Sequence, residues 1–238
     1  MSDDNPFFRL HTGLLREGPG DRKTLDWALS QVSIPKDGAI CDAGCGAGAD
    51  TEALLDYVPE GTLDAVDSHA PFLLDIQKRL GDDPRVTLFH DNYALIKGPY
   101  DLIWSAGAVY FIGVTVALQQ WRAALKPGGA VAFSQVYWKT NKPSNDSKDL
   151  WEDYGHMPYE AEVYDQVRQA GFKVIAGREL SEAAWEEYYT PLEARIAELR
   201  PDADGDLRQV LEQEQREINV WRENKDDYGY LMVVCVPE

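Results

Sequence analysis

The stretch Ala39–Gly48 reads AICDAGCGAG, an apolar run of about five residues that leads into three glycines at alternate positions. A short apolar run bounded by glycines is typical of a buried strand. Gly44, Gly46 and Gly48 permit a tight turn and allow the backbone to approach a ligand closely. Open α/β sheets bind their ligands in loops that follow such strands, so this loop is the first candidate for a binding site.

Strands and helices are predicted to alternate on both sides of this loop. Helices at 51–57, 71–80 and 114–125 separate the central strands, which predicts crossover connections and a sheet covered on both faces. About fifty helical residues separate the last two strands, which can therefore pair antiparallel. We expect a doubly wound α/β fold with a mostly parallel seven-stranded sheet, an antiparallel last strand and a helical cap. The predicted strands are 39–43, 62–67, 86–90, 101–105, 130–136, 172–176 and 230–236.

The chain of 238 residues is expected to form a single domain with three parts. Residues 1–36 are predicted to be a helical lid, and 37–136 the core that binds a cofactor. Residues 137–238 complete the sheet and contain a helical insertion at 181–227.

The charge balance argues against two classes of partner. Asp and Glu number 41 and Lys and Arg 23, which gives a net charge of −18. Such a surface repels phosphate backbones and anionic membranes, so we expect neither a nucleic acid nor a membrane as partner. Three cysteines, no basic leader and no apolar run near ~20 residues favour a cytoplasmic protein. No metal site is predicted, because the four histidines are scattered.

Two acidic residues indicate the kind of cofactor. Asp67 ends the second predicted strand, where a carboxylate can accept hydrogen bonds from both ribose hydroxyls. Asp42 lies just before the glycines, whose G-x-G-x-G spacing differs from the G-x-G-x-x-G of dinucleotide sites. An acidic residue there suits a ligand that has cationic character and no phosphate. S-adenosylmethionine fits that description.

Residues 40–48 resemble the first motif of class I S-adenosylmethionine-dependent methyltransferases, and later motifs follow in order at Asp67, 90–92, 100–105 and 125–129. The resemblance implies the Rossmann-like methyltransferase fold. It also implies that the glycine loop runs along the methionine part and the adenosine, and that Asp42 helps to hold the amino group. Asp67 would bind the ribose, Asp91 and Asn92 would contact the adenine, and Ser105 and Ala106 would lie near the transferred methyl. The cofactor residues implied are Arg16, Asp42, Gly44, Cys45, Gly46, Asp67, Ser68, Asp91, Asn92, Ser105 and Ala106.

Arg16 enters that set through a narrower likeness. Residues 16–20 and 105–113 resemble a bacterial subgroup of small-molecule methyltransferases, in which a basic residue before Gly-x-Gly lies near the amino acid end of the cofactor. Members of the subgroup carry Glu at the position of Ala106, so a shared acidic contact is expected to be absent here and the substrate to differ.

The substrate side is expected to come from the N-terminal segment, the loop after the fourth strand and the C-terminal part. Tyr110, Trp138 and Tyr189 are predicted to line an apolar pocket, and Tyr110 and His11 are the candidate catalytic residues that accept a proton or orient the acceptor. We expect methyl transfer to a small molecule by in-line displacement. A protein that binds S-adenosylmethionine without turnover and a nicotinamide-dependent oxidoreductase remain alternatives, and the sequence leaves the acceptor atom and the oligomeric state open.

Overall fold

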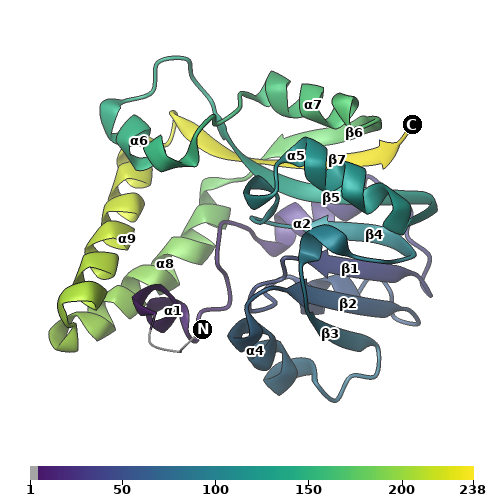
Figure 1. The fold of residues 1–238 in the computed structure, drawn as a ribbon, viewed down its shortest axis with the longest axis horizontal. Helices are drawn as coiled ribbons and strands as arrows, with labels where there is room; N and C mark the ends of the chain where they lie inside the picture. Colours follow the sequence, from purple (N-terminus) through teal and green to yellow (C-terminus); the bar gives the residue numbers. More distant parts are fainter. Residues whose placement is uncertain (1–4) are drawn as a thin grey trace.

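The computed structural model describes residues 5–238, and its centre is one seven-stranded sheet (Figure 1). The strand order is β3-β2-β1-β4-β5-β7-β6, and β7 runs antiparallel to both of its neighbours. The predicted mostly parallel sheet with an antiparallel last strand is therefore confirmed. The strands are β1 Ala39–Ala43, β2 Thr62–Asp67, β3 Val86–His90, β4 Tyr100–Ser105, β5 Leu125–Trp138, β6 Phe172–Glu179 and β7 Tyr228–Pro237.

Helices cover both faces of the sheet because its central strands are apolar on both sides. Along β4, Leu102 and Trp104 pack into the core shared with α2, α3 and α4, whereas Ile103 packs with α5 and α7 on the other face. All three side chains are almost completely buried. The helices are α1 Pro6–His11, α2 Arg22–Leu29, α3 Thr51–Leu55, α4 Ala70–Leu80, α5 Val114–Trp121, α6 Asn145–Leu150, α7 Glu160–Gln169, α8 Glu182–Leu199 and α9 Gly205–Glu223.

The polar helical stretch predicted at 181–227 folds as two helices, α8 and α9, joined by a short connection. Trp185 of α8 stacks on Trp221 of α9 with ring centroids 4.8 Å apart, and Arg222 pairs with Glu186 and Glu193 across the two helices. These contacts join the start of α8 to the end of α9, so the two helices are antiparallel.

This helix pair lies at the end of the sheet where the parallel strands finish. In Figure 1, β7 runs toward the C-terminus at the right, so its antiparallel neighbour β5 and the other parallel strands end on the left, facing α1 and α8. Helix α1 packs against both α8 and α9. Within residues 5–238, no helix is both long enough and apolar enough to cross a membrane.

Candidate functional site

A cavity of about 280 Å³ opens at the carboxyl ends of β1, β2 and β4. Strand β1 lies between β2 and β4, so the chain order reverses at this point of the sheet, which is where open α/β sheets bind ligands. Eight of the eleven residues predicted to bind the cofactor line this cavity: Arg16, Asp42, Gly44, Cys45, Gly46, Asp67, Ser68 and Ala106.

The glycine loop turns sharply after β1 and forms one wall of the cavity. The N–H groups of Gly44 and Cys45 donate to the carbonyl of Val66 at 2.8 and 3.2 Å, which ties the loop to β2. Gly44 has a φ of +75°, and a Cβ placed there would lie 2.5 Å from the Cβ of Ala108. A side chain at Gly44 is therefore excluded by both backbone conformation and space.

Asp67 ends β2 beside this loop. Its carboxylate accepts hydrogen bonds from the N–H of Gly46 at 2.9 Å and from the N–H of His69 at 2.8 Å. The residue is 8% exposed and lines the cavity. An ionised carboxylate has about four acceptor positions, so two bonds from the backbone leave it able to accept from a ligand.

A buried charged group lies on the opposite side of the loop. Asp50 accepts from the guanidinium of Arg16 at 2.5 Å and from the indole N–H of Trp104 at 3.0 Å. Asp42 accepts from the hydroxyl of Thr51 at 2.8 Å, and burial raises the pKa of its carboxyl to about 8. In the protein without ligand, Asp42 is therefore mostly protonated at neutral pH, and a cation placed beside it would favour the ionised form.

Three residues of the predicted cofactor set do not line the cavity among the described residues. Ser105 is fully buried because its hydroxyl donates to the carbonyl of Ala43 at 2.8 Å, which joins β4 to β1. Asp91 and Asn92 follow β3 with exposed side chains, and the Asn92 side chain accepts from the N–H of Ala94 in a short helical turn. Contact of Asp91 and Asn92 with an adenine stays a prediction.

Two of the three predicted substrate residues lie away from the cavity. Tyr189 is fully buried because its ring packs on Trp221 and its hydroxyl donates to Glu217 at 2.9 Å. Trp138 ends β5, and its ring packs edge-on against Tyr228 of β7. These two aromatic residues pack within the C-terminal part of the fold, and their contact with a substrate stays a prediction.

The two candidate proton acceptors are placed differently. Tyr110 lines the cavity, but burial raises the pKa of its hydroxyl well above the usual range. It is therefore a hydrogen-bond donor at neutral pH and not a base. His11 is 1% exposed and is separated from the cavity by Glu17, whose Oε2 lies 2.5 Å from the His11 Nδ1.

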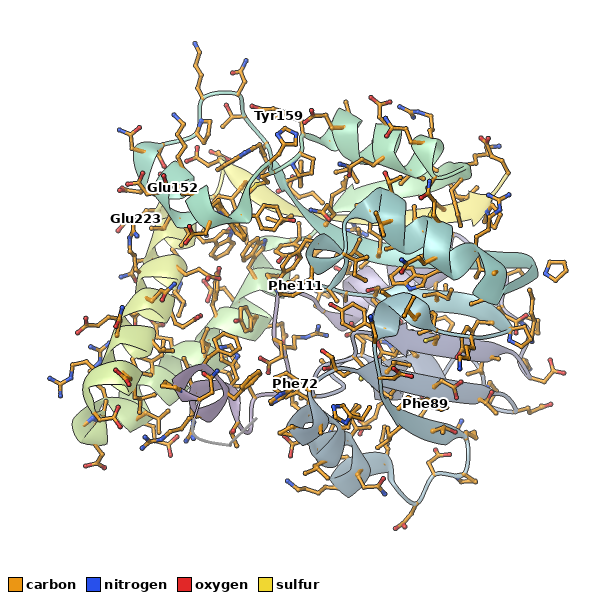
Figure 2. The ribbon with its side chains drawn as sticks, viewed as in Figure 1. Phe72, Phe89, Phe111, Glu152, Tyr159 and Glu223 are labelled. Carbon is orange, nitrogen blue, oxygen red and sulfur yellow. The ribbon has the colours of Figure 1, made fainter. Side chains whose placement is uncertain are left out.

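Glu17 and most of the aromatic residues that line the cavity were not predicted from the sequence. Glu17 directly follows Arg16, which was a predicted cofactor residue, but nothing in the local sequence pattern showed which way the Glu17 side chain would point. Phe72 and Phe111 lie on the side of the sheet that faces α1 and α8 (Figure 2). The apolar side chains that line the cavity are Phe7, Phe8, Leu15, Phe72, Tyr93, Tyr110 and Phe111, together with small residues of the loops.

Comparison with known proteins gives the same assignment as the site geometry. Residues 41–131 match the family described as "Methyltransferase domain". The chain is 30% identical over 112 residues to a malonyl-[acyl-carrier protein] O-methyltransferase of Magnetococcus marinus, covering 45% of this chain and 42% of that protein. It is also 30% identical over 132 residues to a trans-aconitate 2-methyltransferase of an Acidovorax species, covering 52% and 50%. The chain thus spans about half the length of the curated relatives it matches.

Solved structures agree on the fold. An S-adenosylmethionine-dependent methyltransferase from Thiobacillus denitrificans, solved with S-adenosylhomocysteine, superposes with a TM-score of 0.83 at 16% identity over all of both chains. A methyltransferase from Geobacter sulfurreducens, also solved with S-adenosylhomocysteine, gives 0.79 at 18% identity over 98% of both chains.

The seven-stranded sheet with this strand order is the class I methyltransferase fold, and the cavity lies at the carboxyl ends of its strands. The match to the methyltransferase domain covers residues 41–131, which include most of the strands that form the cofactor side of the cavity.

Proposed function

We propose that this protein transfers a methyl group from S-adenosylmethionine to a small-molecule acceptor held in the cavity at the ends of β1, β2 and β4. The observation that carries the proposal is the position of Asp67 beside the glycine loop at the point where the strand order reverses. S-adenosylmethionine supplies an electrophilic methyl group bonded to a sulfonium.

The residues of the cavity fit the parts of this cofactor. The carboxylate of Asp67 is able to accept from ribose hydroxyls, and the glycine backbone leaves room beside the loop, because a Cβ at Gly44 would meet Ala108. Arg16 would lie near the amino acid end of S-adenosylmethionine, and Asp50 holds the Arg16 guanidinium in place. A cationic ligand also suits a lining that contains Glu17 and Asp67.

The protein would act mainly by alignment and by excluding water. In-line transfer needs the acceptor on the side of the methyl opposite the sulfur, and a closed apolar pocket keeps water from that position. The aromatic lining contributed by α1, α4 and the turn at Val109–Phe111 would form the apolar wall of such a pocket, and Phe7 and Phe111, which are 40% and 72% exposed, lie at its mouth. The acceptor binds between this lining and the glycine loop.

Calorimetric titration with S-adenosylhomocysteine, run beside NAD⁺, tests the cofactor assignment. We expect binding of S-adenosylhomocysteine and none of NAD⁺, and the reverse result would favour an oxidoreductase. Transfer is then measured as enzyme-dependent formation of S-adenosylhomocysteine from S-adenosylmethionine with a broad panel of acceptors. Tight cofactor binding with no acceptor in the panel turned over would contradict the enzymatic proposal and favour a binding protein.

A further inference from the structure

Glu17 lies where the segment between α1 and α2 passes over the glycine loop. A Cβ built at Gly46 would lie 3.3 Å from the Cγ of Glu17, so the Glu17 side chain covers the loop that we assign to the cofactor. The side chain is 21% exposed and lines the cavity. Burial raises the pKa of Glu17, which brings the carboxylate closer to the range of a useful base.

Behind Glu17 is a buried imidazole that faces three carboxylates. His11 Nδ1 lies 2.5 Å from Glu17, and Glu214 and Glu217 of α9 act electrostatically on the same ring. Burial lowers the pKa of His11, but the three carboxylates outweigh that effect and raise it. Burial also raises the pKa of the Glu214 carboxyl to about 7 and raises that of Glu217, so these two groups carry less negative charge than free carboxylates would. Of the four residues, Glu17 is the one that lines the cavity.

The cluster also contains polar groups that no described residue satisfies. Tyr188 is 7% exposed, its hydroxyl makes no hydrogen bond within residues 5–238, and it interacts electrostatically with Glu217, Glu214 and Glu17. The Glu214 carboxylate makes no hydrogen bond or ion pair with any residue in that range either. The Glu214 side chain is only half-buried and the Tyr188 hydroxyl keeps some exposure, so water can hydrogen-bond to both groups. Tyr110, which lines the cavity, also acts electrostatically on Tyr188.

Resting on the proposed function, we propose that the methyl acceptor is an amine that carries an aromatic or other apolar group. Its ammonium would face Glu17, and its apolar part would lie among the phenylalanine side chains at the cavity mouth. The ammonium gives one proton to the Glu17 carboxylate. The freed nitrogen lone pair then forms the bond to the methyl carbon, while the carbon–sulfur bond breaks and its electron pair stays on sulfur. The products are a methylated ammonium ion and S-adenosylhomocysteine, and Glu17 returns its proton to solvent.

A carboxylate acceptor fits this cavity less well. Among the described residues that line it, Arg16 is the one arginine or lysine, and the proposed function places it at the amino acid end of the cofactor, so no second cation remains for an acceptor carboxylate. An acceptor carboxylate near the glycine loop would instead meet Glu17 and Asp67, and like charges in a partly buried site repel strongly. The names of the curated relatives, one acting on a malonyl group and the other on trans-aconitate, therefore do not extend to this chain's acceptor.

The test compares acceptors that differ only in the reacting group. Phenethylamine and a set of related arylalkylamines are assayed with radiolabelled S-adenosylmethionine beside 2-phenylethanol and 3-phenylpropionate. We expect kcat/KM for at least one amine to exceed that of its matched alcohol and acid by tenfold or more. Transfer to the alcohol or the acid in preference to every amine would overturn the inference, and so would transfer to none of the amines.

The Glu17→Gln variant keeps the shape of the side chain and removes its charge and basicity. We expect kcat/KM for the amine to fall at least thirtyfold. We also expect the dependence of kcat/KM on pH to differ from that of the wild type, because the side chain at position 17 no longer accepts a proton. Exposed Glu212 of α9 offers a matched control, since Glu212→Gln should leave the amine rate within twofold of the wild type. A Glu17→Gln enzyme as active as the control would overturn the role of Glu17.

The cofactor titration separates the two proposals. Failure of the wild type to bind S-adenosylhomocysteine would defeat the proposed function itself. Binding of S-adenosylhomocysteine together with transfer to an alcohol or an acid would leave the proposed function standing and defeat only the assignment of an amine.

Discussion

Replacement of Asp67 by asparagine tests the cofactor site at the residue on which the proposal most depends. The carboxylate accepts from the N–H groups of Gly46 and His69, at 2.9 and 2.8 Å, and is 8% exposed. Asparagine keeps the shape but turns one acceptor oxygen into a donor NH₂ group. One backbone N–H of the loop then loses its hydrogen-bond acceptor, and a ribose hydroxyl loses a charged acceptor.

The expected magnitude follows from these bonds. A hydrogen bond to a charged group contributes about 1.5–3 kcal/mol, so losing one from the ribose weakens binding roughly 10- to 150-fold. The assay is calorimetric titration with S-adenosylhomocysteine, with thermal unfolding to show that the variant is folded.

Asp64 provides the control for this substitution because it lies on the same strand and accepts from the Tyr100 hydroxyl at 2.9 Å, outside the cavity lining. Asp64→Asn should leave the dissociation constant within twofold of the wild type. If folded Asp67→Asn bound S-adenosylhomocysteine as tightly as Asp64→Asn does, the assignment of the ribose to Asp67 would be refuted.

Three further substitutions test the site and the fold. Burial raises the pKa of Asp42 to about 8, above an unfolded value of ~3.9, so the stability given by its protonated form is lost as pH rises from about 4 through 8. The Asp42→Asn variant should lack that pH dependence, and plots of Tm against pH that run parallel for the variant and the wild type would contradict this. Gly44→Ala should abolish S-adenosylhomocysteine binding because the new Cβ would lie 2.5 Å from the Cβ of Ala108. Gly113 has a similar φ of +88° but no atom near the position of a Cβ, so Gly113→Ala should retain binding, and equal affinities of the two variants would contradict the role of the clash. Trp221→Ala removes a side chain that is 2% exposed between α8, α9 and β7, and urea unfolding should show a loss of about 3–5 kcal/mol; a loss below ~1 kcal/mol would mean that the helix pair does not depend on this ring.

The sheet was predictable from the sequence because its strands are local features. Runs such as 39–43 and 101–105 are mostly apolar, and glycines or polar turns bound them, so their buried positions follow largely from composition. The position of Asp67 was predictable for the same reason, since the carboxyl ends of parallel strands meet at one edge.

The substrate side was less predictable because distant segments form it. Helix α1 reaches the cavity by packing on α8 and α9, about 170 residues later in the chain, and no periodicity in 1–20 indicates that packing. Glu17 was not predicted for this reason, and His11, predicted as a catalytic candidate, lies behind Glu17 and does not line the cavity. Tyr189 and Trp138 were chosen for their residue type, but aromatic residues also fill cores, and these two pack within the C-terminal part.

A crystal structure of the protein grown with saturating S-adenosylhomocysteine tests the central claim most directly. Density for the ligand is expected in the cavity at the ends of β1 and β2, with both ribose hydroxyls within hydrogen-bond distance of Asp67 and the sulfur facing the side lined by Glu17 and Tyr110. An empty cavity under those conditions, or a ligand whose ribose lies away from Asp67, would contradict the account.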